Sequence, residues 1–298
     1  MSIDYTNQPI EEEITTISLN VRNTHGDNLV TDFRYPKNTK KKLPLVIFCH
    51  GFKGFKDWGC FPYMLDSIAE EDVFTVSFNF SYNGTGDNAI DQTEFTRLDL
   101  FAQNTFSREL DDLRSVIDYL DANSDKFHYD INDITLVGHS RGGGIAIIKT
   151  SEDTRVKKLV VLSSVANFNR YSDEQINNWK KRGYIEVLNT RTKQKMRLNY
   201  TLMEDLIVNK DRLDLKKAIA KIKVPTLIIH GEQDLAVPSS EAKTLYDSSS
   251  KEYTKLKVYP NTGHTFGAVH PFKGTSSGIE TVIWDIIEFV KEKPEDKN

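Results

Sequence analysis

Short apolar segments alternate along this chain with amphipathic ones. The apolar segments are rich in β-branched and aromatic residues, which is typical of buried strands. Strands are predicted near 14–21, 29–35, 44–50, 73–79, 133–138, 157–162, 225–230 and 254–259. Helical spacing predicts helices near 61–71, 106–123, 142–150, 239–249 and 277–292. This alternation predicts an α/β fold with a mostly parallel, eight-stranded sheet, helices on both faces and an antiparallel edge made by the first strands.

One segment interrupts the alternation. Between the strands near 157–162 and 225–230 lie about sixty residues, too many for a single crossover helix. This segment is rich in charged and amide side chains, with aromatic and methionine residues interspersed. A short hairpin is expected within 184–198, turning around Asn189 to Thr192. We therefore expect one catalytic core made of residues 1–165 and 223–298, with residues 166–222 as an insertion.

The strand near 133–138 runs into the sequence Gly138-x-Ser140-x-Gly142, and a helix is predicted directly after it. A serine on so sharp a strand-to-helix turn adopts strained backbone geometry, and glycines two residues before and after it remove steric collisions. The pattern resembles the nucleophile elbow of α/β-hydrolases, in which the turn projects the serine hydroxyl over the sheet. A glycine-rich turn with an ordinary serine is the alternative.

Two later segments carry an acid and a histidine, each after a predicted strand. Asp234 lies in the turn after the strand near 225–230, and His264 lies in the loop after the strand near 254–259. Glu232 is a rival acid and His270 a rival base. Asp234 is preferred for its spacing from the preceding glycine, and His264 for the Gly-His pair. Ser140, Asp234 and His264 follow the Ser, acid, His order of α/β-hydrolases.

With these residues, the chain resembles serine hydrolases of the α/β-hydrolase superfamily over residues 28–292. Within it, residues 50–56 and 74–80 are similar to bacterial carboxylesterases of the cinnamoyl (feruloyl) esterase type, to dienelactone hydrolases and to prolyl-oligopeptidase-like peptidases. The resemblance implies an oxyanion hole formed by the backbone N–H groups of Phe52 and Arg141. Arg141 departs from several such esterases, which carry Gln or a small residue there.

The resemblance implies cleavage of small acyl or aryl carboxylic esters through an acyl-enzyme, as in a carboxylesterase-type serine hydrolase. It also implies that residues 166–222 form a lid above the elbow. Our hypothesis is that aromatic and methionine residues of this segment line the pocket, with Trp179, Tyr184 and Met203 as substrate contacts. The alternative for these residues is the small core of the lid itself. A prolyl-oligopeptidase-like peptidase, a thioesterase, a dienelactone-type hydrolase and a hydrolase-fold binding protein remain open.

The composition of the chain limits the kinds of ligand and partner that we expect. The net charge is −4 and acids and bases are interleaved, so nucleic acid is not expected as a partner. The two cysteines, Cys49 and Cys60, have no metal-ligand spacing, and neither metal nor cofactor is expected. The N-terminus lacks a signal-peptide pattern and no apolar run suits a membrane span, so a cytoplasmic location is predicted. The oligomeric state stays open.

Overall fold

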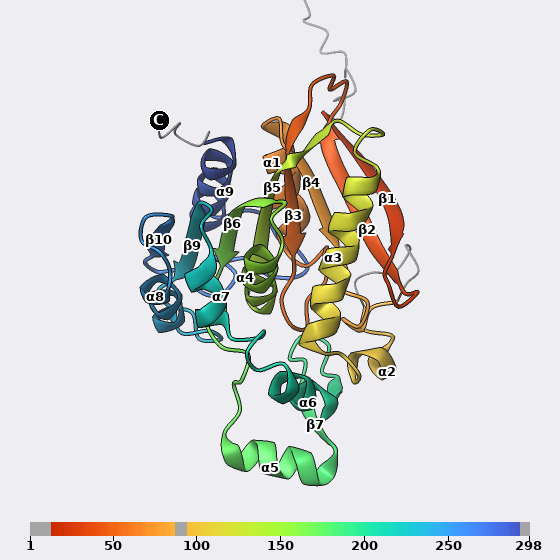
Figure 1. Cartoon of the computed structure of the whole chain (residues 1–298), viewed down its shortest axis with the longest axis vertical. Coiled ribbons are helices and arrows are strands. Elements are labelled where there is room, and N and C mark those ends of the chain that lie inside the picture. Colours follow the sequence, from red (N-terminus) through yellow and green to blue (C-terminus); the bar gives the residue numbers. More distant parts are fainter. Residues whose placement is uncertain (1–12, 87–93, 293–298) are drawn as a thin grey trace, which may run out of the picture.

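The computed structural model describes residues 13–86 and 94–292. An eight-stranded sheet lies at the centre of the fold (Figure 1). Its strands follow the order β1-β2-β4-β3-β5-β6-β9-β10. They are β1 (Ile14–Arg22), β2 (Asn28–Pro36), β3 (Leu43–Cys49), β4 (Phe74–Phe78), β5 (Tyr129–His139), β6 (Val156–Leu162), β9 (Thr226–Gly231) and β10 (Thr254–Tyr259). Only the pairs that involve β2 are antiparallel. The predicted mixed sheet and its antiparallel edge are therefore confirmed.

Helices cover both faces of the sheet, as predicted. The helices expected from the sequence are α1 (Phe61–Glu70), α3 (Phe106–Ala122), α4 (Arg141–Glu152), α8 (Ser239–Ser248) and α9 (Ser277–Lys291). Side chains of α3, α4 and α8 belong to one buried cluster, and those of α1 and α9 belong to the other. This is the three-layer arrangement of an α/β-hydrolase fold.

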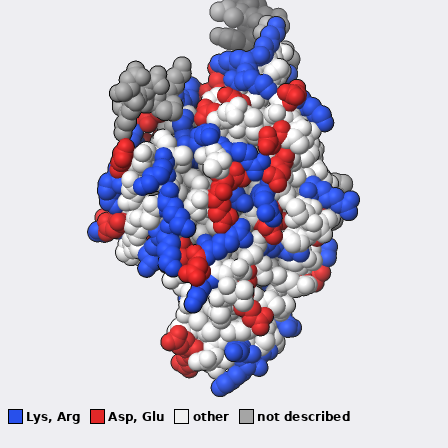
Figure 2. Space-filling model, in the orientation of Figure 1, with Lys and Arg blue, Asp and Glu red and all other residues white. Residues whose placement is uncertain are grey.

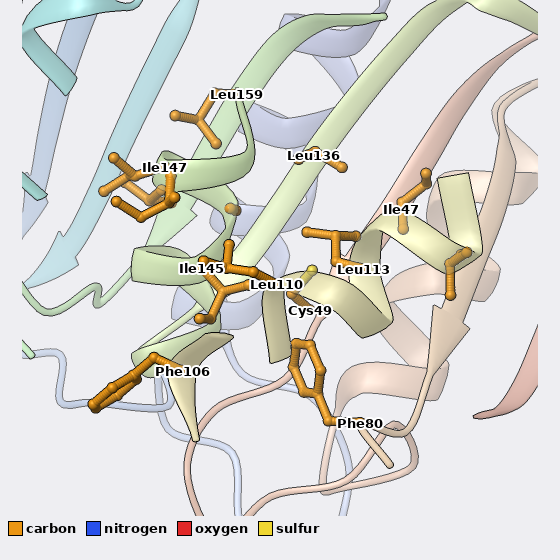
Figure 3. Close-up of a cluster of buried hydrophobic side chains, with 14 of the residues drawn as sticks. Ile47, Cys49, Phe80, Phe106, Leu110, Leu113, Leu136, Ile145, Ile147 and Leu159 are labelled. Carbon is orange, nitrogen blue, oxygen red and sulfur yellow. The ribbon is translucent and has the colours of Figure 1, made fainter. Parts of the chain in front are cut away.

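Strand β3 shows why the sheet has two buried faces. Its residues Ile47 and Cys49 contribute to the cluster under α3 and α4, whereas Val46 and Phe48 contribute to the cluster under α1 and α9. Alternate side chains of a strand point to opposite faces, so a strand buried on both sides becomes apolar throughout. Figure 3 shows the first cluster, in which Ile47 and Cys49 lie close to side chains of α3. Packing on both faces fixes the register of the strands, and with it the positions of the loops at their carboxyl ends.

The segment 166–222 contains elements that periodicity alone did not resolve. They are α5 (Asp173–Arg182), the hairpin β7 (Tyr184–Leu188) and β8 (Lys195–Asn199), α6 (Thr201–Val208) and α7 (Leu215–Lys221). The predicted hairpin is confirmed, with Tyr184 paired to Asn199. In Figure 1, α5, β7 and α6 protrude beyond one end of the sheet, while α7 lies with α4 against the core. We call the protruding part, residues 166–210, the cap.

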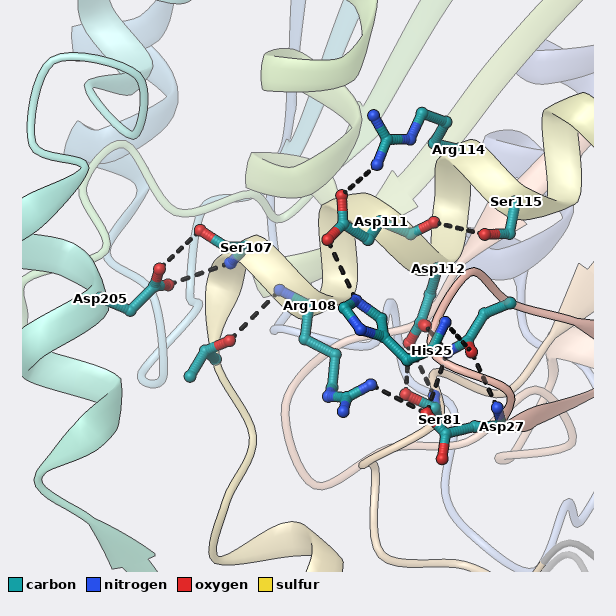
Figure 4. Close-up of polar contacts among 12 residues, drawn as sticks. His25, Asp27, Ser81, Ser107, Arg108, Asp111, Asp112, Arg114, Ser115 and Asp205 are labelled. Carbon is teal, nitrogen blue, oxygen red and sulfur yellow. Dashed lines mark hydrogen bonds and ion pairs between the residues drawn. The ribbon is translucent and has the colours of Figure 1, made fainter.

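The cap is fastened to the core by polar contacts. Asp205 of α6 accepts hydrogen bonds from the amide (3.0 Å) and the hydroxyl (2.5 Å) of Ser107, in the first turn of α3 (Figure 4). The Asn199 amide donates to the Ala102 carbonyl, just after the short helix α2 (Leu98–Phe101), over 2.8 Å. A carboxylate at a helix N-terminus also interacts favourably with the helix dipole. The cap is thus held at the carboxyl end of the sheet.

Charges are mixed on the outer surface. On the face drawn in Figure 2, Lys and Arg are interspersed with Asp and Glu over core and cap. In the part of the chain that the structure describes, no helix is long and apolar enough to cross a membrane.

Candidate active site

Ser140 occupies a strained turn between β5 and α4. Its backbone lies at φ 56° and ψ −119°, a region that L-residues rarely adopt, and α4 begins at the next residue. Such a conformation costs about 1–3 kcal/mol and persists only where the surroundings over-determine it. Here the Ser140 amide donates to the Leu162 carbonyl over 2.9 Å, and the Gly143 amide donates to the Ser140 carbonyl over 3.1 Å.

The glycines around Ser140 are required by close backbone approach. A Cβ added to Gly138 would lie 2.4 Å from the Gly142 carbonyl oxygen, and one added to Gly142 would lie 2.3 Å from the Cys49 carbonyl oxygen. No side chain fits at such distances. The turn is therefore the predicted elbow, and Gly142 lets α4 pack directly onto the end of β3.

Asp234 and His264 are joined by a hydrogen bond. His264 Nδ1 lies 2.7 Å from Asp234 Oδ2. Their loops are fastened together, because the Gln233 amide donates to the Thr262 carbonyl over 2.9 Å. Asp234 is buried, whereas the rival acid Glu232 is exposed to solvent. Of the two acids considered from the sequence, Asp234 is the one in contact with the histidine.

The surroundings of Asp234 keep it ionised. Burial by itself would raise the pKa of its carboxyl, but hydrogen bonds from His230, His264 and the Val237 amide hold that pKa well below its usual range. The other oxygen, Oδ1, accepts from the amides of Ala236 (2.8 Å) and Val237 (2.9 Å). An ionised carboxylate on Nδ1 assigns the proton to that nitrogen and leaves Nε2 of His264 free to accept one.

His230 is a neighbour of Asp234 that the sequence reasoning missed. It lies on β9, is fully buried, and its Nε2 is 2.8 Å from the Val237 carbonyl oxygen and 3.2 Å from Asp234 Oδ2. Its Nδ1 is buried without a hydrogen-bond partner among the described residues. The signal available in the sequence was a histidine on the same strand end, four residues before the acid. His230 makes Asp234 a carboxylate that two imidazoles contact.

Ser140 and His264 line one cleft of about 860 Å³ at the carboxyl end of the sheet, under the cap. The described residues record no hydrogen bond between the Ser140 hydroxyl and the imidazole. In a ligand-free site such bonds are often long or poorly aligned.

The segments that carry the amides of Phe52 and Arg141 lie beside Ser140. Arg141 is the first residue of α4, and the Gly51-Phe52 turn after β3 approaches so closely that a Cβ on Gly51 would lie 3.0 Å from Ser140 Cβ. Both Phe52 and Arg141 line the cleft. Within residues 13–86 and 94–292, neither amide donates to a protein acceptor. The two N–H groups are available to an oxyanion.

The remaining histidines have other contacts. His139 lies beside His264, with its Nε2 3.0 Å from the His264 carbonyl oxygen, and burial lowers its pKa to about 3. His50 Nε2 accepts from the Phe80 amide over 3.3 Å, and burial lowers the His50 pKa to about 4. The rival base His270 lines the cleft, but its Nδ1 accepts from the Gly59 amide over 2.9 Å. None of these three histidines forms a hydrogen bond with Asp234, in contrast to His264.

The structure corrects two of the three expected substrate contacts. Trp179 is completely buried in the cap, where its Nε1 donates to the Leu198 carbonyl over 3.0 Å, and it does not line the cleft. Tyr184 lies between the guanidinium groups of Arg182 and Arg197, also outside the cleft. Met203 of α6 does line the cleft. Periodicity could not separate these roles, because a cap this small needs aromatic residues for its own core.

The sequence reasoning also missed part of the cleft wall. The cleft lining includes aromatic and cationic residues outside the motifs: Lys53, Trp58, Phe106, Phe168, Arg170, Tyr171 and Arg191. Among the described residues, no group of three or more His, Cys, Asp or Glu side chains is placed to hold a metal ion.

Fold and site together define a protein of the α/β-hydrolase fold. The BD-FAE family model matches residues 93–248, more than half of the chain, so the chain belongs to that family. The model of the dienelactone hydrolase family matches residues 210–292, which include Asp234 and His264.

Curated relatives and solved structures extend this similarity. An uncharacterized 31.7 kDa protein of Escherichia coli is 22% identical over 75% of this chain and 83% of its own length. A Mycoplasma genitalium protein named "Putative esterase/lipase 2" is 22% identical over 81% of this chain and 90% of its own length. The structure of Est1E from Butyrivibrio proteoclasticus with bound ferulic acid superposes with a TM-score of 0.69 at 21% identity, covering 91% of this chain and 97% of that one. At this identity the structural match shows the fold.

Replacing Gly142 by alanine should destabilise the elbow. The added Cβ would lie 2.3 Å from the Cys49 carbonyl oxygen, so β3 and α4 must separate. We expect a loss of about 1–3 kcal/mol in the free energy of unfolding, measured by urea titration. Gly263→Ala is the matched control, because the nearest atom to its added Cβ is 3.9 Å away. Equal stability of the two variants would contradict the close packing described for the elbow.

The buried His50 should lower the free energy of unfolding as the pH becomes acidic. Its pKa is lowered from 6.5 to about 4 in the folded protein, so between these values the unfolded chain binds more protons. The free energy of unfolding therefore decreases as pH falls through this range. From pH 7 to pH 4.5, His50→Gln should lose about 2–3 kcal/mol less than the wild type in urea titrations. The exposed His128, replaced by Gln, serves as control; an unchanged pH dependence in His50→Gln would refute the assignment of a neutral buried imidazole.

Proposed function

We propose that this protein is a carboxylesterase-type serine hydrolase that cleaves carboxylic esters through an acyl-enzyme. The observation that carries the proposal is the 2.7 Å contact between His264 and a buried Asp234, at the edge of the cleft that also holds the strained Ser140. In the roles we assign, Ser140 is the nucleophile, His264 the general base and Asp234 the group that orients and stabilises the imidazolium.

In this mechanism, Nε2 of His264 takes the proton of the Ser140 hydroxyl as its oxygen attacks the ester carbonyl. The carbonyl oxygen becomes an oxyanion and accepts hydrogen bonds from the amides of Phe52 and Arg141. When the tetrahedral intermediate collapses, His264 returns the proton to the departing alcohol. Water then attacks the acyl-enzyme with His264 again as base, which releases the acid and restores Ser140. Removing one such amide donor costs about 2.7–4 kcal/mol in a measured case.

The names of similar proteins support ester cleavage. The Mycoplasma genitalium relative is named an esterase/lipase, the Est1E structure holds ferulic acid, and the dienelactone hydrolase model covers the acid and the histidine. A dienelactone is itself an ester closed into a ring, so a dienelactone-type hydrolase would use the same steps and differ only in the leaving group. The substrate is therefore proposed at the level of a small-molecule carboxylic ester. A cytoplasmic location stays a prediction.

We propose further that residues 166–222 act as a lid over this site, separate from a catalytic core of 1–165 and 223–298. The cleft is closed on one side by Leu202 and Met203 of the cap and by residues 189–191 at the turn of its hairpin. Apolar side chains there would exclude water from the acyl-enzyme and limit the size of the acyl or alcohol group. The substrate contact proposed from the cap is Met203, in place of Trp179 and Tyr184.

Ser140→Ala should abolish ester turnover without unfolding the protein. Removing the nucleophile is expected to lower kcat/KM by about 10⁴-fold or more. The assay uses p-nitrophenyl esters of increasing acyl length, methyl ferulate and an aminoacyl p-nitroanilide. A fluorophosphonate should label the wild type and leave Ser140→Ala unlabelled, while circular dichroism checks the fold. Substantial ester turnover in Ser140→Ala would refute the mechanism, and turnover of the anilide alone would favour a peptidase.

Asp234→Asn tests which of the two acidic residues, Asp234 or Glu232, acts with His264. The amide keeps the shape of the side chain but would stabilise the wrong tautomer of His264, which in a measured triad lowered kcat about 10⁴-fold. Glu232→Gln is the matched control, because Glu232 is exposed two residues away. Its kcat should stay within about twofold of the wild type. A similar loss in both variants, or none in Asp234→Asn, would refute the assignment.

A further inference from the structure

The charged side chains that line the cleft, histidines aside, are all cationic. They are Lys53, Arg141, Arg170 and Arg191, and among the described residues no Asp or Glu lines the same cleft. The whole chain has 43 acidic and 39 basic residues, so this wall departs from the composition of the chain. It also departs from the mixed surface of Figure 2. Such a wall raises the local concentration of an anionic ligand.

Arg141 is the cation nearest the proposed chemistry, because it follows Ser140 directly. Its guanidinium lies over the Phe52 ring, 4.1 Å from the centroid, and over the Phe106 ring at 5.0 Å. Phe52 stacks in turn on Phe101 and Phe106 on Phe168, with centroids 5.5 and 4.2 Å apart. The guanidinium is thus held between aromatic rings, which fixes its orientation at low entropic cost when a ligand binds.

The carboxylate next to Arg141 compensates its charge only in part. Arg141 Nη1 lies 3.4 Å from Oε1 of the buried Glu109, longer than the 2.7–2.9 Å typical of a charge-assisted bond. Glu109 Oε2 is buried without a hydrogen-bond partner among the described residues. Burial raises the pKa of Glu109, although Arg141 and Asn104 oppose this. Among those same residues this is the single hydrogen bond of the guanidinium, so its other N–H donors are available.

Of the other three cations, the two arginines have their carboxylate partners outside the cleft lining. Arg170 pairs with Glu241 at 2.5 Å, and Arg191 lies 3.7 Å from Glu94. Lys53 donates to the Leu188 carbonyl over 3.1 Å and has no carboxylate partner within the described residues. The positive ends of these pairs face the cleft, and the N-terminus of α4 adds a further partial positive charge at Ser140.

We propose that the substrate of this site is an ester that also carries a carboxylate, and that Arg141 binds that carboxylate. The proposal rests on the proposed function, since it names the substrate class of the same site. A planar guanidinium with spare donors matches a carboxylate in two parallel hydrogen bonds, and the surrounding rings exclude water from them. Arg141 would then have two separate roles: its amide binds the oxyanion and its side chain selects the substrate.

The test compares two pairs of esters that differ only in replacing a carboxylate by a carboxamide. Methyl 4-carboxybenzoate and methyl 4-carbamoylbenzoate carry the group on the acyl side; 4-acetoxybenzoate and 4-acetoxybenzamide carry it on the alcohol side. For each pair we compare the ratio of kcat/KM, anionic over neutral, in the wild type and in Arg141→Met. Any general effect of the variant on catalysis divides out of this ratio.

We expect the ratio to fall by at least about tenfold in Arg141→Met for one of the pairs, and that pair identifies the side that holds the carboxylate. Glu109→Gln keeps the shape beside Arg141 but removes the competing charge, so it should raise the same ratio; it also carries the test if Arg141→Met fails to fold. Arg212→Met is the matched control, because Arg212 pairs with Glu152 away from the cleft, at 2.7 Å. Ratios unchanged for both pairs in both cleft variants would overturn the proposal.

A binding measurement separates this proposal from the proposed function. Calorimetry with Ser140→Ala, which cannot turn the ester over, compares the carboxylate and carboxamide esters directly. Tighter binding of the carboxylate, lost in Ser140→Ala/Arg141→Met, supports carboxylate binding by Arg141 independently of turnover, whereas a wild type that hydrolyses no ester would refute the proposed function. Equal binding of carboxylate and carboxamide overturns it, while Ser140-dependent hydrolysis of neutral esters would still support the proposed function.

Discussion

The close contact among three backbone segments at Ser140 is the constraint on which the rest of the site depends. Strand β5 ends at the elbow, α4 starts there, and β3 passes so near that Gly142 has room for no side chain. A positive φ at Ser140 is tolerated because those segments are themselves fixed by the two buried faces of the sheet. The turn at Ser140 is therefore strained locally, and the packed core provides the stability that maintains it.

The same packing brings the loops of separate strands to one edge of the sheet. β9 and β10 are parallel neighbours, so the turn that carries Asp234 and the loop that carries His264 meet and are joined by backbone hydrogen bonds. At this edge, burial and hydrogen bonding determine which side chains are charged. His139 and His50 stay neutral near pH 7 because they are buried, whereas the amides and imidazoles around Asp234 keep its carboxylate ionised. The same edge of the sheet therefore has the negative charge of Asp234 next to His264, and positive charge on the cations that line the cleft.

The cap contributes shape more than chemistry. Its own small core, centred on Trp179, lets the hairpin and α6 stand away from the sheet, and the bond of Asp205 to Ser107 fixes α6 over the start of α3. Met203 then reaches the cleft from α6, while residues 189–191 reach it from the hairpin turn. A cap built in this way can change its cleft-facing residues without disturbing the elbow.

The sequence by itself determined the layered fold, because strands buried on both faces must be apolar throughout and their helices must be amphipathic. It also determined the elbow, because Gly138 and Gly142 around Ser140 form a motif that is recognisable over five residues. Asp234 and His264 were indicated by their positions directly after predicted strands. Only the tertiary structure decided what lies beside these residues. His230 on Asp234, the burial of Trp179 away from the cleft and the cations collected around Arg141 all depend on contacts between segments far apart in the chain. The spacing of apolar residues predicts which face of a helix or strand is buried, but it does not predict which residues pack against that face.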